Sequence, residues 1–289
     1  MEELKAFRHR IEKHFARLTN SEQKIAAYLL ANFDQAAFLT ASQLARHLEI
    51  SEATVVRFAR SIGYRSFPEF KRVVQDIYRF KATPATRLQH KLADLQSGKG
   101  HVLHQIIEME LQYLAEVPHS IATQDFDRAV KLLLKSKRIF VFGTGPSRIL
   151  ADLMELRLRR FGLTIFGLTE SGRDVLDKLL LLRRDDAVIA AGFHRVTGEL
   201  LAVLNHARRV GAPAILLTDT LNAQFKKRAS VVLSARRGPV STFHSLTVPM
   251  AIINAIILAV ALECPATSVA SLDLLQSLRA ESGLDFSGK

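Results

Sequence analysis

The chain has 289 residues, enough for two domains of ordinary size, and 48% of them are hydrophobic, a share that excludes a disordered protein. A single cysteine excludes an internal disulfide framework and suits a reducing compartment. The 40 Lys and Arg against 28 Asp and Glu give a net charge of +12, spread along the chain, which weakly favours a polyanionic partner such as nucleic acid.

The sequence contains no pattern typical of a leader or of a membrane span. The beginning, MEELKAFRHRIEKHF, lacks the apolar core of a secretory signal. The longest uncharged apolar run, residues 248–262, includes Pro249 and Asn254 and is shorter than the roughly 18 to 20 residues that cross a bilayer. It therefore predicts a buried core helix or a helix at a subunit interface. We expect a cytoplasmic protein without a membrane partner.

Residues 1–80 predict helices throughout, because no alternating strand pattern occurs there. In LTNSEQKIAAYLLANF the apolar residues recur at helical spacing. Either Ser21, or Thr19 with Glu22 as a capping box, is expected to begin this helix.

The stretch TASQLARHLEISEATVVRFARSIGYRSF predicts a helix-turn-helix. Ser42 is expected to cap a short first helix, Ser51 to cap a second helix over residues 52–62, and Gly63 to end it. Glu49 stands in the turn where glycine is usual. A left-handed conformation there would cost a residue other than glycine about 1–2 kcal/mol, which the fold can tolerate.

The second of these helices has the composition of a recognition helix. Val55, Phe58 and Ile62 share one face and are expected in the core, while the opposite face carries small, polar and basic residues suited to the major groove. Arg57 is expected to read a guanine or to bind a phosphate. The alternative is an ordinary helix pair with solvated arginines. The predicted DNA-contacting residues are Ser42, Ser51, Glu52, Ala53, Thr54, Arg57, Arg60, Ser61, Tyr64 and Arg65, with Lys71 extending the contact with the DNA backbone.

The second half of the chain predicts a parallel α/β sheet. Residues 81–100, which include a proline and end in Gly-Lys-Gly, are typical of a linker with some helix in it, and a further helix is expected over residues 104–115. Five short apolar runs follow, RIFVFG, LTIFGL, DAVIAAG, PAILLTD and SVVLSA, with helix-length segments in the first three gaps. Alternating buried strands and helices predict a parallel sheet covered on both faces.

The segment FGTGPSR follows the first expected strand and opens a long helix. Gly143 and Gly145 allow the backbone to turn tightly and to approach a ligand. Ser147 offers a hydroxyl beside free backbone N–H groups at the positive end of the helix dipole, which favours an anion. A Gly-x-Gly pattern is weak evidence alone, because tight strand-to-helix turns often use glycine for geometry only.

Together, LTNSEQKIAAYLL, ASQLARHLEISEATVVRFARSIGYRSFPEFK and IFVFGTGPS resemble the RpiR/MurR-type bacterial transcriptional regulators. These proteins pair an N-terminal helix-turn-helix domain with a C-terminal sugar isomerase (SIS) domain, and the resemblance covers nearly the whole chain. It implies a multidomain protein: an all-α helix-turn-helix domain over residues 1–80, a linker over residues 81–100, and over residues 101–289 a three-layer αβα SIS domain, whose sheet has five parallel strands. It also implies a homodimer or homotetramer on a palindromic DNA operator, controlled by a phosphosugar or related anionic metabolite.

The resemblance further implies that the loop after the third strand completes the ligand site. The family pattern there is Ser-x-Ser-Gly-x-Thr, whereas this chain places Gly192 and His194 at the serine positions and Arg195 at the glycine; Thr197 matches. One interpretation is that Arg195 binds the anion through its bidentate fork, with His194 as a pH-dependent donor. The other is that the site has decayed, with Arg195 in solvent or paired with Glu170.

Polar residues at other strand ends are expected near the same crevice, where ligands of parallel sheets collect. Ser171 follows the second strand and Thr218 and Asp219 end the fourth, while Ser245 precedes the long apolar helix. For each, local capping is an equally good explanation. The predicted ligand-binding residues are Gly143, Gly145, Ser147, Ser171, Gly192, His194, Arg195, Thr197 and Ser245.

A phosphosugar isomerase is the alternative from a different functional class. Enolisation needs a positioned general base, and Glu170, Glu199, His194 and His244 are candidates by residue type only. Nothing in the sequence fixes their mutual geometry. We therefore expect no catalytic residues, no cofactor and no metal. A third possibility is a DNA-binding protein whose SIS domain binds no ligand.

Overall fold

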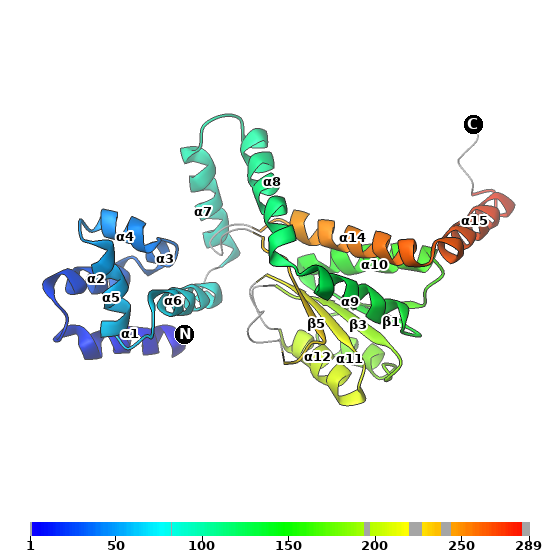
Figure 1. The fold of residues 1–289 in the computed structure, drawn as a ribbon, viewed down its shortest axis with the longest axis horizontal. Coiled ribbons are helices and arrows are strands. Elements are labelled where there is room, and N and C mark those ends of the chain that lie inside the picture. The colour runs from blue at the N-terminus through cyan, green and yellow to red at the C-terminus, as the bar shows by residue number, and fades with distance from the viewer. Residues whose placement is uncertain (1, 82, 194–196, 220–226, 238–243, 285–289) are drawn as a thin grey trace. The chain divides into compact units, whose positions relative to one another are not determined.

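The computed structural model describes residues 2–81, 83–193, 197–219, 227–237 and 244–284 (Figure 1). The chain divides into two compact units, one within residues 1–99 and one within residues 100–289. The first unit has a single hydrophobic core, and the second has one core on each face of a sheet.

The first unit is helical in its described part. Its elements are α1 (Glu2–Phe15), α2 (Asn20–Ala31), α3 (Phe33–Ala36), α4 (Ala41–His47), α5 (Glu52–Ser61), α6 (Phe67–Lys81) and α7 (Pro84–Ser97). Ile11, Ile25, Phe58 and Val74 come from four different helices and are fully buried in one core. The predicted all-α fold is confirmed here. Helix α7 occupies most of the stretch that was expected to be a linker with some helix.

Capping boxes begin two helices of this unit. At α2 the Thr19 hydroxyl accepts from the Glu22 N–H (3.4 Å), while the Glu22 carboxylate accepts from the Thr19 N–H (2.9 Å). At α4 the Thr40 hydroxyl accepts from the Gln43 N–H (3.1 Å), and the Gln43 side-chain oxygen accepts from the Thr40 N–H (2.8 Å). The prediction that Ser42 caps α4 is wrong: Ser42 lies inside the first turn, because Thr40 and Gln43 already satisfy the free N–H groups.

A five-stranded parallel sheet forms the centre of the second unit. Its strands are β1 (Ile139–Phe142), β2 (Ile165–Leu168), β3 (Ala187–Ala191), β4 (Ala214–Thr218) and β5 (Val231–Ser234). Their order in the sheet is β2-β1-β3-β4-β5, and all neighbouring pairs are parallel. The five predicted strands and their parallel arrangement are confirmed.

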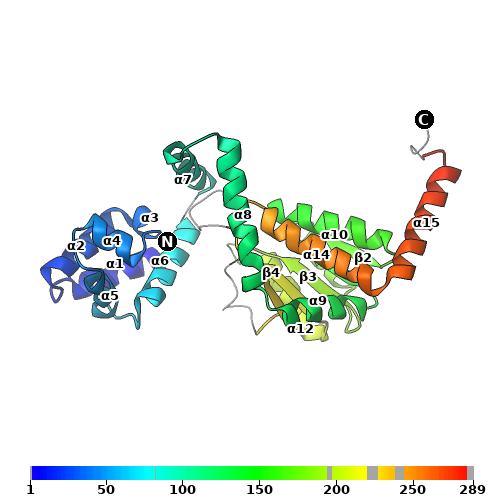
Figure 2. The same cartoon turned by 45° about the horizontal axis from the view of Figure 1, so that its top comes forward.

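Helices cover both faces of this sheet, which makes a three-layer αβα sandwich (Figure 1). They are α8 (Val102–Ser120), α9 (Thr123–Leu134), α10 (Arg148–Arg160, after a 3-10 turn η1 at Gly145–Ser147), α11 (Asp174–Leu179), α12 (Gly198–Val210) and α14 (Thr247–Glu263). The last helix, α15 (Pro265–Glu281), extends beyond the end of α14 and covers neither face. Val141 and Ile189 belong to the core beneath α9, α10 and α14, whereas Phe142 and Ala190 belong to the core beneath α11 and α12. The alternation follows from the two-residue period of a strand. Figure 2 shows α14 running alongside α10.

The long apolar run predicted to be a core or interface helix forms α14. Its Ile252, Ile256 and Val260 are buried in the core of the second unit, whereas Leu258 and Leu262 are 67% and 79% exposed. Within the described ranges no single helix is long and apolar enough to cross a bilayer. Helices α14 and α15 reach that length only as a pair bent by 102°.

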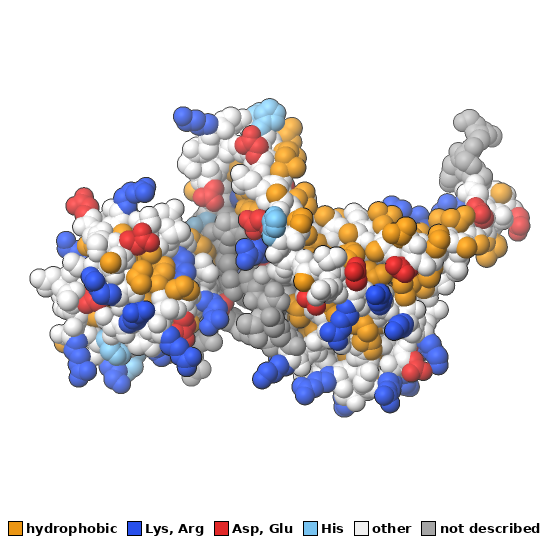
Figure 3. Space-filling view, viewed as in Figure 1, with side chains coloured by type: hydrophobic (Ala, Val, Ile, Leu, Met, Phe, Trp, Pro, Cys, Tyr) orange, Lys and Arg blue, Asp and Glu red, His pale blue; other side chains and the backbone are white. Residues whose placement is uncertain are grey.

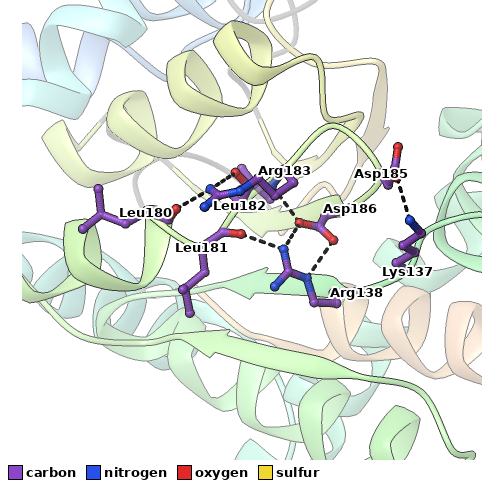
Figure 4. A network of polar contacts seen from close by, with 8 residues as sticks. All are labelled: Lys137, Arg138, Leu180, Leu181, Leu182, Arg183, Asp185 and Asp186. Carbon is purple, nitrogen blue, oxygen red and sulfur yellow. Dashed lines mark hydrogen bonds and ion pairs between the residues drawn. The ribbon is translucent and has the colours of Figure 1, made fainter.

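An ion pair between the half-buried Arg138, directly before β1, and the buried Asp186 joins β1 to the segment that precedes β3 (Figure 4). Asp186 is 1% exposed, and Arg138 donates to its two carboxylate oxygens from Nε (2.9 Å) and Nη2 (2.7 Å). The Arg183 N–H donates to the same carboxylate (2.7 Å). Beside it, Lys137 and Asp185 form an ion pair at 2.9 Å, in which both side chains are more than half exposed. The two neighbouring aspartates therefore make pairs of different burial.

Replacing these two aspartates separately is expected to give very different losses of stability. Asp186→Ala removes the acceptor of the Arg183 N–H and the charged partner of Arg138, which keeps only the Leu181 carbonyl, and should cost about 2 kcal/mol of unfolding free energy. Asp185→Ala removes an exposed pair and should cost less than about 1 kcal/mol. Urea unfolding followed by circular dichroism measures both. Equal losses would show that the Arg138–Asp186 pair does not have this structural role.

Candidate DNA-contacting helix and ligand cavity

Helix α5 has the buried and exposed faces predicted for a recognition helix. Val55, Phe58 and Ile62 are fully buried. Ser51 caps the helix as predicted, because its Oγ accepts from the Thr54 N–H at 3.1 Å. The helix is therefore fixed at its first turn and along one side.

The turn between α4 and α5 has the left-handed residue that the sequence indicated. Glu49 has φ +53° and is the only residue other than glycine with positive φ in the described part of the chain. The Ile50 N–H donates to the Ala45 carbonyl (3.0 Å), which closes the turn. Gly63, at φ +87°, ends α5 as predicted.

The opposite face of α5 is open to solvent. Glu52, Ala53, Arg57, Arg60 and Ser61 are exposed and Thr54 is half-buried. Arg57 Nη2 donates to the Thr54 hydroxyl (3.3 Å), so Thr54 holds the guanidinium along the helix. An exposed, partly oriented arginine at this position suits contact with a base edge or a phosphate.

Ser61 has a structural partner that sequence reasoning missed. Its hydroxyl donates to Glu22 Oε1 at 2.6 Å and thereby joins α5 to α2. Burial raises the pKa of Glu22, but the hydrogen bonds from Ser61 and Thr19 outweigh burial and hold the pKa below its ordinary value. The 8% exposed carboxylate therefore stays ionised and anchors the recognition helix.

The residues after α5 differ in their availability to DNA. Arg65 is exposed, and Tyr64 is half-buried with the Arg10 guanidinium 4.8 Å above its ring. Lys71 does not extend the contact surface as predicted, because its half-buried Nζ donates to the carbonyls of Ala36 and Leu39. Burial lowers its pKa to about 8. Lys71 is therefore a tether between α6 and the segment before α4.

In the second unit a cavity opens at the carboxyl ends of β1 and β3. Neighbouring strands leave the sheet in opposite directions there, and α/β sheets of this order bind ligands at that point. The cavity has a volume of about 150 Å³. We call it the β1–β3 cavity; its lining is Phe142, Thr144, Pro146, Ser147, Ala191, Gly192, Phe193, Thr197, Leu200 and Arg237.

The first wall of the β1–β3 cavity is the loop between β1 and α10. A Cβ on Gly143 would lie 2.4 Å from the Ser147 carbonyl oxygen, and Gly145 has φ +56°, so both positions need glycine. Ser147 lies at the N-terminus of α10, and its half-buried side chain makes no capping bond to that helix. Its hydroxyl is therefore available at the positive end of the helix dipole.

The second wall is the segment that follows β3. Gly192 extends the strand, since its N–H donates to the Leu217 carbonyl (3.0 Å). Thr197 caps α12 by accepting from the Leu200 N–H (3.1 Å). His194 and Arg195 lie outside the described residues, and their predicted ligand contacts stay predictions. Glu170, the salt-bridge partner suggested for Arg195, forms an ion pair with Lys178.

Sequence reasoning missed Arg237, the one charged side chain in the described lining of the cavity. It is 7% exposed and donates to Asp219 Oδ2 from Nη2 (3.0 Å) and from Nε (3.3 Å). The guanidinium lies 4.0 Å from the centre of the Phe193 ring. The sequence feature that could have indicated Arg237 is the pair Arg236–Arg237 directly after the fifth apolar run, at the expected end of a strand. Strand β5 brings Arg237 to the end of β4 and so beside the cavity.

Several other predicted residues do not line this cavity. Ser171 is exposed beyond β2, and Ser245 accepts from the Thr247 N–H at 3.0 Å, which is the local role considered for it. Burial raises the pKa of Glu170, but the hydrogen bond from Lys178 and further bonds hold it below its ordinary value. Backbone N–H groups of Glu199 itself and of Gly172 lower the pKa of Glu199. Both carboxylates are therefore poorly suited to act as a general base at neutral pH.

The chain therefore combines a unit of the helix-turn-helix type with an αβα unit that has a cavity at its switch point. The family model described as "Helix-turn-helix domain, rpiR family" matches residues 5–79, and the SIS domain model matches residues 132–259. The two matches cover more than two thirds of the chain. The chain belongs to the RpiR family of helix-turn-helix transcriptional regulators with an SIS domain.

Named regulators align with this chain over most of its length. The chain is 29% identical over 239 residues to an uncharacterized HTH-type transcriptional regulator of Haemophilus influenzae, covering 78% of each chain. It is 29% identical over 214 residues to the HTH-type transcriptional regulator HexR of Escherichia coli, covering 73% of this chain and 71% of that one. The structure of Vibrio vulnificus NanR complexed with ManNAc-6P shares the fold, with a TM-score of 0.58 and 19% identity over 95% of this chain and 98% of that one. The protein is accordingly a DNA-binding transcriptional regulator.

The strained turn before the recognition helix gives a direct test of its geometry. Glu49→Gly should stabilise the protein by up to about 1 kcal/mol, because glycine adopts positive φ without the clash of a Cβ. Glu49→Ala is the matched control, since it removes the same charge and keeps the clash. Thermal unfolding compares the two variants. A glycine variant no more stable than the alanine variant would contradict the left-handed turn.

Proposed function

We propose that the β1–β3 cavity binds a small anionic metabolite of the phosphosugar class, and that this binding modulates the affinity of the helix-turn-helix unit for its operator. The observation that carries the proposal is the Ser147 hydroxyl, which lines the cavity at the N-terminus of α10 and makes no capping bond to that helix. Hydroxyls beside free N–H groups at a helix N-terminus are common phosphate ligands. The Arg237 guanidinium lies in the same lining, where it is paired with Asp219.

Within this proposal the second loop contributes as its sequence suggests. Arg195 is a bidentate anion ligand, His194 is a pH-dependent donor, and Thr197 positions the start of α12. NanR, which shares the fold, was solved with a phosphorylated sugar, and this supports the choice of ligand class.

We further propose that the protein acts in the cytoplasm as a homodimer or homotetramer on a palindromic operator and does not catalyse a reaction. Exposed apolar side chains support the self-association. Val102, Ile107 and Leu111 stand exposed along α8, and Leu262 and Val269 do so on α14 and α15. Figure 3 shows hydrophobic side chains along these helices. Most of the apolar face of α14 is buried in the core of its own domain. The contact between copies of the chain therefore uses these exposed side chains and not the buried face of α14.

Binding of phosphosugars should be visible as a thermal shift. A ligand at 100 times its Kd stabilises the fold by about 2.7 kcal/mol, so a panel of hexose and pentose phosphates should contain at least one that raises the melting temperature. Ser147→Ala should weaken that ligand about tenfold or more, since it removes a hydrogen bond to a charged group. Ser277→Ala, on exposed α15, is the control and should bind normally. Absence of any shift, or equal affinity in Ser147→Ala, would contradict the proposal.

Arg57 should dominate recognition by α5. Arg57→Ala is expected to weaken binding to an operator selected from random duplex DNA by about 1–3 kcal/mol and to relax the base preference at one position. Arg8→Ala on α1, also exposed, is the control and should change affinity little. Fluorescence anisotropy at fixed salt measures both. Unchanged affinity of the Arg57 variant would remove this residue from the contact surface.

A further inference from the structure

A pair of basic residues precedes every strand of the sheet. Five segments lead into the strands: residues 135–138, 159–164, 183–186, 208–213 and 227–230. They contain eleven Lys and Arg and only two acids, Asp185 and Asp186. Because all five strands are parallel, these segments lie on one edge of the sheet, opposite the β1–β3 cavity. We call them the amino edge.

Backbone hydrogen bonds join the amino edge into one continuous row. The Ile139 N–H donates to Thr164, and the Ala187 N–H to Arg138. The row continues from the Val188 N–H to Pro213 and from the Ser230 N–H to Ala214, each at 2.7 to 3.0 Å. The five segments are therefore neighbours in the order of the strands, although they are far apart in the sequence. Arg160 and Arg208 lie at the ends of α10 and α12, which cover opposite faces of the sheet.

Most of these cations are not neutralised. Lys137 and Arg138 use the two aspartates, and Arg159 pairs with Glu155. Seven cations make no ion pair within the described residues, and all but the half-buried Arg160 are exposed: Lys135, Arg160, Arg183, Arg184, Arg208, Arg209 and Lys227. Figure 3 shows Lys and Arg side chains over the region where Figure 1 labels α11, α12 and β1.

Helix capping explains only part of this pattern. Arg159, Arg160, Arg208 and Arg209 lie in the last turns of α10 and α12, where cations complement the helix dipole. Lys135 is the C-terminal cap of α9, and the Arg183 guanidinium donates to the Leu180 and Leu182 carbonyls just after α11. Arg184 lies beyond the end of α11. Exposed cations gathered at one edge add like-charge repulsion to the fold, which a bound polyanion relieves.

The unpaired cations of the edge are spread out and do not converge on one point. Strands about 4.8 Å apart place the outer members of a five-stranded sheet about 19 Å apart. The seven cations without an ion pair are distributed along this edge and at the ends of helices on both faces of the sheet. Duplex DNA presents phosphates along its whole length, so it suits a spread of cations. A single small anion would instead need convergent groups in a cavity, such as those at the other edge.

We propose that the amino edge of the SIS domain is a second DNA-contacting surface that binds the phosphate backbone without reading sequence. The helix-turn-helix unit of the same chain already holds DNA, so the edge meets flanking duplex at an effective concentration on the order of millimolar. Exposed arginines in loops position a protein on DNA through phosphates and carry no base specificity. The opposite edge stays free for the ligand.

The salt dependence of DNA binding tests this surface in the full chain. The edge variant is Arg183→Gln/Arg184→Gln/Arg208→Gln/Arg209→Gln. The control variant, Arg128→Gln/Lys131→Gln/Arg148→Gln/Arg173→Gln, removes four exposed cations elsewhere in the same unit. Both are measured on one duplex several helical turns longer than the operator. Each lost phosphate contact lowers the slope of log K against log salt by about 0.9, so the edge variant should lose about 2 to 4 of slope and the control less than about 1.

Equal slopes in the edge variant and the wild type, or equal losses in both variants, would overturn the proposal. Loss of binding to phosphatidylserine vesicles or to single-stranded RNA with an unchanged DNA slope would also overturn it. Arg208→Gln/Arg209→Gln is the second variant if the fourfold one unfolds, and it should lose about half as much slope. A phosphosugar thermal shift that is retained in the edge variant separates failure here from failure of the sensing proposal.

Discussion

Parallel strand pairing gives the second unit two chemically different edges, and the order β2-β1-β3-β4-β5 decides what each edge carries. At the carboxyl edge the chain leaves β1 and β3 toward opposite faces, and this divergence opens the β1–β3 cavity. At the amino edge the same pairing gathers basic residues from five distant segments. The Arg138–Asp186 pair ties the beginning of β1 to the beginning of β3, and so it helps to set the alignment of the two strands on which the cavity depends.

The DNA-binding unit relies on a comparable constraint between helices. The buried Glu22 carboxylate caps α2 and accepts from Ser61 at the far end of α5, so one ionised group fixes both helices. The strained turn at Glu49 sets the direction of α5 at its other end. Arg57 can therefore be presented by a helix that is held at both ends, which is what positioning in a major groove requires.

The sequence predicted the elements that depend on local patterns. The two-residue and 3.6-residue periods gave the strands, their buried faces and the helix-turn-helix, and turn chemistry gave Ser51, Glu49 and Gly63. The errors concern contacts between distant segments or competing caps. Thr40 displaced Ser42 because it has Gln43 as its reciprocal partner. Lys71 donates to carbonyls of residues between α3 and α4, which are distant in the sequence. Arg237 lies beside the cavity because β5 pairs with β4. No local pattern encodes such partners.

In the proposed function the cavity and the recognition helix are energetically linked. The most direct measurement is the Kd for the selected operator with and without a saturating amount of the phosphosugar that most stabilises the protein. Linkage is reciprocal, so the Kd of that sugar must change by the same factor when operator is bound. We predict a change of about 5- to 150-fold in both constants, the usual range of allosteric coupling. An operator Kd that is the same with and without the bound sugar would contradict the account.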